Sequence, residues 1–283
     1  MVRLIGILVG LGFTLVVVIA LVTGAYTWAT EDVEPAAYDE FHLYPNETAF
    51  SFDGPFGRWD YAQLQRGYKV YKEVCSACHG LKFVAFRNLA ELGYSEAQVN
   101  AEAATWQVPG VDPRTGEATS RAAEATDYFP DPYPNAVAAA AANNNAIPPD
   151  LSLITKARHD GSNYLHSLLT GYDAVPDELR EQFPDSVPGP GLHYNPYFHS
   201  LALAMAPPLT SDGQVTYDDG TDPTIAQMSK DVTAFLTWTA EPKMVERKQT
   251  GWAALGFVLF ATVLAYLAKK QVWAPVTPKR RKD

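Results

Sequence analysis

Cys75, Cys78 and His79 form a C-x-x-C-H run that contains both cysteines of the chain. Residues three apart lie on the same side of a helical turn, so both thiols can reach one edge of a flat porphyrin, and the histidine that follows can offer its imidazole to the iron. This spacing is typical of covalent attachment of a c-type haem. The run therefore predicts one covalently bound haem c, with His79 as an axial ligand of the iron, and one-electron chemistry.

Three other readings of the run are weaker. They are a disulfide between the two cysteines, half of a zinc site and a thioredoxin-like redox motif. A zinc site would need a second pair of ligands at short spacing, whereas the remaining histidines are scattered along the chain: His42, His159, His166, His193 and His199. A thioredoxin-like motif is expected in a βαβ unit, which this segment lacks. Haem attachment is the favoured interpretation.

A haem that only transfers electrons needs a second axial ligand, usually Met or His. Met205 is the best-placed methionine, because its neighbours in 203–209 are small residues and prolines that allow close approach to a ring and stiffen the loop. Met228 is expected in the core on the apolar face of a helix, and Met244 lies among charges. Histidine ligation is the alternative, with two candidates: His193 and His199.

Two segments are apolar enough to enter a membrane. Residues 250–268 lack any charge, and at ~1.5 Å per residue a helix of this length covers most of a ~30 Å hydrocarbon core. We expect an anchor at 247–270 and a basic cytoplasmic tail at 271–283, because six cations follow the apolar run: Lys269, Lys270, Lys279, Arg280, Arg281 and Lys282. Residues 1–29 read as an apolar export signal, with a retained N-terminal membrane segment as the alternative.

The region between the two apolar segments, 30–246, is predicted to be a periplasmic haem domain. Residues 31–246 hold 31 Asp and Glu against 13 Lys and Arg, a net charge of −18. Such a surface either attracts a basic partner or only keeps the domain soluble. Hydrophobic periodicity predicts helices at 61–74, where Gly67 leaves room for a close helix crossing, and at 224–239. Further helices are expected at 89–104 (exposed), at 136–142, where an alanine run ends in three asparagines, and at 163–170, which Gly171 closes.

Several ordered motifs across most of 48–275 resemble the cytochrome c1 family. They are AFSFDGPFGRWDYAQLQRGYKVYKEVCSACHG, PPDLSLITKARHDG, LLTGY, YNPYF, AMAPPL, DGQVTYDDGTDPTIAQMSKDVTAFLTWTAEP and the ERKQTG start of the anchor. A lone C-x-x-C-H would indicate only a c-type cytochrome, whereas these motifs in this order, followed by an anchor, are specific for the cytochrome c1 family. Residues 94–146 and 177–185 match the pattern loosely, and the extra disulfide of some bacterial relatives cannot form here.

The resemblance implies a mainly α fold, with a class I cytochrome c core, wrapping loop insertions and a C-terminal transmembrane helix. The helices at 61–74 and 224–239 would cross. The family pattern makes Met205 the sixth iron ligand and places Arg158 and Tyr164 near the haem propionates, where a guanidinium and a phenol suit a carboxylate. It also implies a set of ring contacts: Pro148, Pro149, Asn143, Ile154, Leu168, Phe198 and Pro208.

The resemblance further implies an electron-transfer subunit of the respiratory cytochrome bc1 complex, the quinol–cytochrome-c reductase. It would pass electrons from the Rieske iron–sulfur protein to cytochrome c, hold no quinol site of its own, and lie beside cytochrome b in a dimeric complex of the bacterial inner membrane. No nucleic-acid partner is expected. The alternatives are a free-standing, membrane-anchored c-type cytochrome that shuttles electrons to a terminal oxidase, and a haem-based sensor with an open sixth position.

Overall fold

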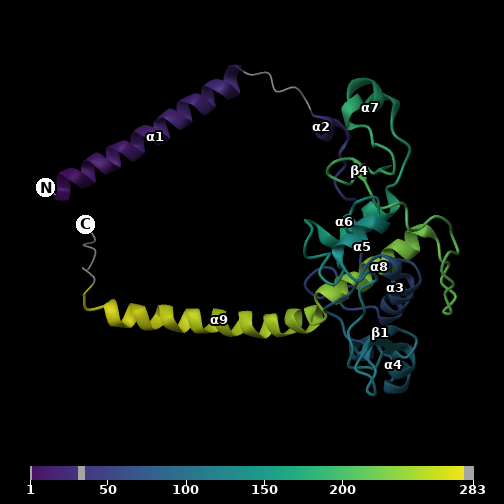
Figure 1. The fold of residues 1–283 in the computed structure, drawn as a ribbon. Coiled ribbons are helices and arrows are strands. Elements are labelled where there is room, and N and C mark those ends of the chain that lie inside the picture. Colours follow the sequence, from purple (N-terminus) through teal and green to yellow (C-terminus); the bar gives the residue numbers. More distant parts are fainter. Residues whose placement is uncertain (1, 31–35, 277–283) are drawn as a thin grey trace. The chain divides into compact units, whose positions relative to one another are not determined.

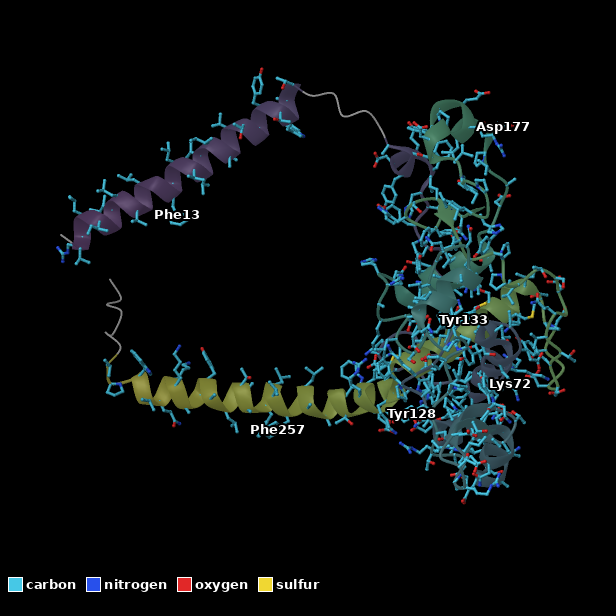
Figure 2. All side chains as sticks on the ribbon, viewed as in Figure 1. Phe13, Lys72, Tyr128, Tyr133, Asp177 and Phe257 are labelled. Carbon is cyan, nitrogen blue, oxygen red and sulfur yellow. The ribbon has the colours of Figure 1, made fainter. Side chains whose placement is uncertain are left out.

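The computed structural model describes residues 2–30 and 36–276, and its described part is mainly helical (Figure 1). The chain divides into two units, Met1–Phe41 and His42–Asp283. The first unit contains α1 (Val2–Thr30) and the short α2 (Ala37–Phe41). Helix α1 is apolar and exposed along its length, as its labelled Phe13 illustrates (Figure 2). The choice between an export signal and a retained segment at 1–29 stays open.

Two crossed helices form the centre of the second unit. They are α3 (Tyr61–Glu73) and α8 (Ile225–Ala240), which lie against each other over much of their length (Figure 1). A Cβ atom on Gly67 would lie 2.0 Å from the backbone oxygen of Asp231, so only glycine permits this approach. The predicted crossing is therefore confirmed, and the two helices match the predicted ranges within a residue or two.

A buried ion pair joins the crossed helices. The Arg66 guanidinium donates to the carboxylate of Asp231 at 2.9 Å and to that of Asp219 at 2.6 Å. The Asp231 side chain is fully buried and also accepts hydrogen bonds from the amides of Gln63 and Gln227 at 3.0 and 2.8 Å. A buried carboxylate is tolerated only when its oxygens are paired in this way. The network therefore fixes the register of the two helices.

The prediction of one exposed helix at 89–104 is wrong. The segment forms a 3₁₀ helix, Phe86–Leu92, and then α4 (Glu96–Ala103). The break falls at Gly93, which has a φ of 92°, and Ser95 caps the second helix by accepting from the backbone N–H of Gln98. Both pieces also bury apolar side chains in the core: Phe86, Leu89, Leu92, Val99 and Ala103. A glycine in the left-handed conformation ends a helix, so Gly93 divides the segment into two shorter pieces.

The remaining elements of the second unit are short. Helices α5 (Ala136–Ala142) and α6 (Gly161–Thr170) agree with the predictions. Helix α7 (Asp177–Gln182) is short, with 6 residues. Two antiparallel hairpins were not predicted. They pair β1 (Gln107–Val111) with β2 (Ala118–Ala122), and β3 (His193–Tyr194) with β4 (Ala202–Leu203).

Helix α9 (Met244–Trp273) follows α8 after a short break. Within the described residues, α1 and α9 are the helices that are long and apolar enough to cross a membrane. Apolar side chains of α9 such as Phe257 project outward and are exposed (Figure 2). Most of the predicted basic tail, Lys279 to Lys282, lies outside the described residues.

Candidate haem-binding site

The cysteine run lies where α3 ends. Residues Cys75–Ala77 form one turn of 3₁₀ helix, and the backbone N–H groups of Cys78 and His79 both donate to the Cys75 carbonyl, at 3.1 and 3.0 Å. This turn places the two thiols and the imidazole within one short, hydrogen-bonded loop. Both thiols are free, so the structure contains no disulfide between them.

The Cys75 thiol is not tuned for thiol–disulfide exchange. Burial, reinforced by the nearby Cys78, raises the pKa of Cys75 to about 12. Exchange-active C-x-x-C thiols have pKa values below that of free cysteine. A half-buried thiol that packs against the core beside the end of α3 instead suits a permanent thioether bond.

The imidazole of His79 is oriented by its second nitrogen. Nδ1 lies 2.7 Å from the carbonyl oxygen of Pro149. A carbonyl only accepts, so Nδ1 carries the proton and Nε2 carries the free lone pair, as in metal-bound histidines. Burial lowers the pKa of His79 more than Pro149 and Asp150 raise it, which keeps the ring neutral. The Tyr71 hydroxyl also donates to the His79 carbonyl, at 3.0 Å.

Met205 is half-buried and packs against the same hydrophobic core as Cys75. The loop that carries it is fixed at both ends. The Tyr172 hydroxyl donates to the Met205 carbonyl at 3.0 Å, and the Gln214 side-chain amide donates to the Pro208 carbonyl at 2.8 Å. The stiff loop predicted around Met205 is therefore held by side-chain hydrogen bonds as well as by its prolines.

Arg158 and Tyr164 lie close together. Burial raises the pKa of Tyr164, and the Arg158 guanidinium opposes this rise through a hydrogen bond and its charge. Tyr164 in turn adds to the effect of burial in raising the pKa of Tyr172. Of these three residues, Tyr172 is the one that contacts the Met205 backbone.

The other predicted ring contacts differ in burial. Ile154 and Leu168 are buried, whereas Pro149 is exposed. The rest are half-buried: Asn143, Pro148, Phe198 and Pro208. Asn143 is the C-terminal cap of α5, and its side-chain amide donates to the Ala139 carbonyl at 2.7 Å.

The other methionine and histidines considered as a second axial ligand differ in their surroundings. Met228 is fully buried in the core, as predicted. His193 is half-buried in β3, and His199 is exposed, with its ring centroid 6.5 Å from that of His42.

Three tyrosines at this site were not singled out from the sequence. Tyr71 and Tyr172 bind the backbones of the two proposed iron ligands, and the Tyr133 hydroxyl lies 3.6 Å from the Cys78 sulfur. Tyr133 is labelled within the second unit (Figure 2). Tyr172 ends the LLTGY motif and Tyr71 lies on the apolar face of α3, so motif and periodicity pointed to both positions without revealing their hydrogen bonds.

The donor set fits a haem c. It combines two free thiols on one turn, a neutral imidazole whose Nε2 is free for a metal, and a thioether in a fixed loop. Across residues 2–30 and 36–276, no group of three or more His, Cys, Asp or Glu is arranged to hold a metal ion. The two thiols and the oriented imidazole suit a cofactor that is attached through sulfur and ligated by one imidazole.

Known proteins are similar in sequence to this chain over most of its length. A profile of the Cytochrome C1 family matches residues 50–276. The chain is 43% identical over 236 residues to a cytochrome c1 from Rhodospirillum rubrum, covering 80% of this chain and 86% of that protein. It is 42% identical over 246 residues to the mitochondrial "Cytochrome c1, heme protein" of Saccharomyces cerevisiae, covering 85% of this chain and 76% of that protein.

A bacterial relative has a longer chain. The "Cytochrome b/c1" of Bradyrhizobium diazoefficiens is 49% identical over 245 residues, which cover 81% of this chain. The match spans only 36% of that protein. The similarity therefore concerns one part of the Bradyrhizobium protein.

Proposed function

Because the chain belongs to the cytochrome c1 family, a family whose members carry a covalent haem c, we propose that it is the electron-transfer subunit of a respiratory cytochrome bc1 complex. In this role it accepts electrons from the Rieske iron–sulfur protein and passes them to cytochrome c. The observation that carries the proposal is the extent of the match, 50–276, which includes both the C-x-x-C-H turn and α9. A small soluble carrier would share only the first of these.

We assign roles to the site residues on this basis. Cys75 and Cys78 form the thioether bonds, and His79 and Met205 are the axial ligands. When bound, the haem supplies a one-electron centre whose potential is set by these ligands and by its surroundings. The Pro149 carbonyl orients the His79 ring, and the Tyr172 hydroxyl orients the Met205 loop. Both proposed ligands are thus positioned by hydrogen bonds from other segments of the chain.

Two further groups of residues complete the site. Arg158 and Tyr164 hold the propionates, which gives a charged ligand group a guanidinium partner. The ring contacts are Pro148, Pro149, Asn143, Ile154, Leu168, Phe198 and Pro208. Apolar contacts on the ring exclude water, which raises the potential and limits the reorganisation that accompanies electron transfer.

The chain is proposed to lie in the bacterial inner membrane, with 30–246 in the periplasm and 271–283 in the cytoplasm. Its partners are cytochrome b, the Rieske protein and cytochrome c, in a dimeric complex. The net charge of −18 over 31–246 supports docking of a basic cytochrome c. No quinol site is assigned to this chain, so quinol oxidation takes place on its partners.

The test is gentle solubilisation of membranes that contain a tagged full-length chain, followed by identification of what co-purifies. We expect cytochrome b and the Rieske protein in fixed ratio with the haem of this chain. Recovery of the holo-chain with neither partner would refute the complex and favour a free-standing shuttle. N-terminal sequencing of the same band shows whether 1–29 is removed.

A further inference from the structure

The turn of residues 52–57 is attached to the start of α9. The ammonium group of Lys248 donates to the carbonyl oxygens of Phe52 and Gly54, at 2.7 and 2.8 Å. One turn further along α9, the indole nitrogen of Trp252 donates to the Pro55 carbonyl at 3.5 Å. These contacts join the haem-bearing unit to its own anchor at a point about 195 residues away in sequence.

An exposed aromatic pair stands at this junction. The rings of Phe56 and Trp252 are stacked, with centroids 5.3 Å apart and planes inclined by 12°. Phe56 nevertheless keeps 78% of its surface exposed, and Trp252 keeps 48%. Within the described residues, the stacking on Trp252 is the one aromatic contact of Phe56, and most of the Phe56 side chain is exposed.

The turn is built to present Phe56 outward. Gly54 has a φ of +67°, which favours glycine, and a Cβ on Gly57 would lie 2.2 Å from backbone atoms of Phe52 and Asp53. Phe52 points inward, where it is buried. The two glycines thus allow a tight turn that leaves Phe52 in the core and Phe56 outside.

The position of Trp252 sets the depth of Phe56. The uncharged run of α9 starts at residue 250, so Trp252 lies only ~3 Å along the helix axis from the end of the hydrocarbon span. The interfacial zone of a bilayer is roughly 5–8 Å thick on each side. The Phe56 ring is stacked on the Trp252 ring, with centroids 5.3 Å apart, and so lies at a similar depth, within or beside this zone.

We propose that the 52–57 turn is a second membrane contact of this chain, with Phe56 inserted among the lipid head groups beside Trp252. Aromatic side chains favour this zone because one part of the surroundings is apolar and the other is wet. Two attachments, α9 and the turn, restrict swivelling of the haem-bearing unit about its anchor. The proposal requires α9 to span the membrane and does not depend on the electron-transfer role.

Nitroxide accessibility tests the proposal on the full-length holo-protein in phospholipid nanodiscs. A Phe56→Cys variant carries a single free thiol once both natural cysteines are bound to haem. Collision of its label with oxygen, which concentrates in lipid, is compared with collision with a water-soluble nickel chelate. Thr216→Cys is the aqueous control, because the exposed Thr216 lies in the loop before α8, some 24 Å of helix from the α8–α9 junction. Gly256→Cys in α9 is the lipid reference.

We expect the oxygen-to-chelate ratio at position 56 to exceed that at 216 several-fold and to lie below that at 256. A label at 56 that meets the chelate as often as the label at 216 would overturn the proposal. So would a label sheltered from both reagents, because protein rather than lipid would then cover the turn. If Phe56→Cys does not retain the haem spectrum, Pro55→Cys gives the same comparison from a neighbouring exposed position.

Discussion

Replacing Gly67 with alanine is the sharpest test of the helix crossing that supports the haem site. The added Cβ would lie 2.0 Å from the Asp231 carbonyl oxygen and 2.7 Å from the Phe235 Cβ, whereas ordinary contacts start at 3.4 Å. Neither neighbour is the end of a flexible side chain, so α3 and α8 must separate by about 1.4 Å. Overpacking of this kind costs about 1–3 kcal/mol or more.

A gain in helix propensity opposes this cost. Alanine inside a helix is favoured over glycine by roughly 0.5–1 kcal/mol, so the net loss of unfolding free energy is about 1 kcal/mol or more. For a chain of this size, each kcal/mol lost lowers Tm by about 2–4 °C. The measurement is thermal unfolding of the full-length holo-protein in detergent, followed by the haem absorption.

The control is Gly256→Ala in α9, where nothing lies within 4 Å of the added Cβ. Its Tm should stay unchanged or rise slightly, because only the propensity gain remains. A Gly67→Ala protein as stable as the parent would show that α3 and α8 do not cross as closely as described.

Four further outcomes are expected. Met205→Leu should lower the midpoint potential by about 100 mV or more through loss of the thioether ligand, and an unchanged potential would exclude Met205 as a ligand. Tyr172→Phe should loosen the Met205 loop by about 1 kcal/mol, seen as increased carbon monoxide binding to the reduced protein; equal binding would contradict this role. Hydrogen bonds from the Thr221 backbone and then Arg66 lower the pKa of Asp219 to about 2, so its stabilising effect is present above its ordinary pKa of 3.8 and is lost as pH falls towards 2. In Asp219→Asn, the unfolding free energy should therefore change less with pH between about 2 and 3.8 than in the parent protein. The same pH dependence in both proteins would refute this role of Asp219. Electron transfer to a basic cytochrome c should slow as salt rises; a flat rate would remove the acidic docking surface.

The limits of the sequence prediction are clearest in two places. One exposed helix is predicted at 89–104, yet Gly93 adopts a left-handed conformation and divides the segment, and its apolar side chains pack into the core. The hairpin of β1 and β2 is short and mostly exposed, so it lacks the alternation of apolar and polar residues that marks a strand. Local pattern was sufficient for α3 and α8, which combine apolar periodicity with a capping residue, and for α5 and α6, which end at turn-forming residues.

The cofactor chemistry of this protein can be recognised from local sequence. The spacing of Cys75, Cys78 and His79, the methionine in a proline-rich loop and the uncharged run of α9 are local features, and local spacing is enough to recognise them. Tertiary structure alone decided what orients these groups. The Pro149 carbonyl that fixes the His79 tautomer lies 70 residues away from it, and the Tyr172 hydroxyl that holds the Met205 loop lies 33 residues away. Hydrogen bonds between distant segments leave no periodic signal in a sequence, because they depend on how the chain folds back on itself.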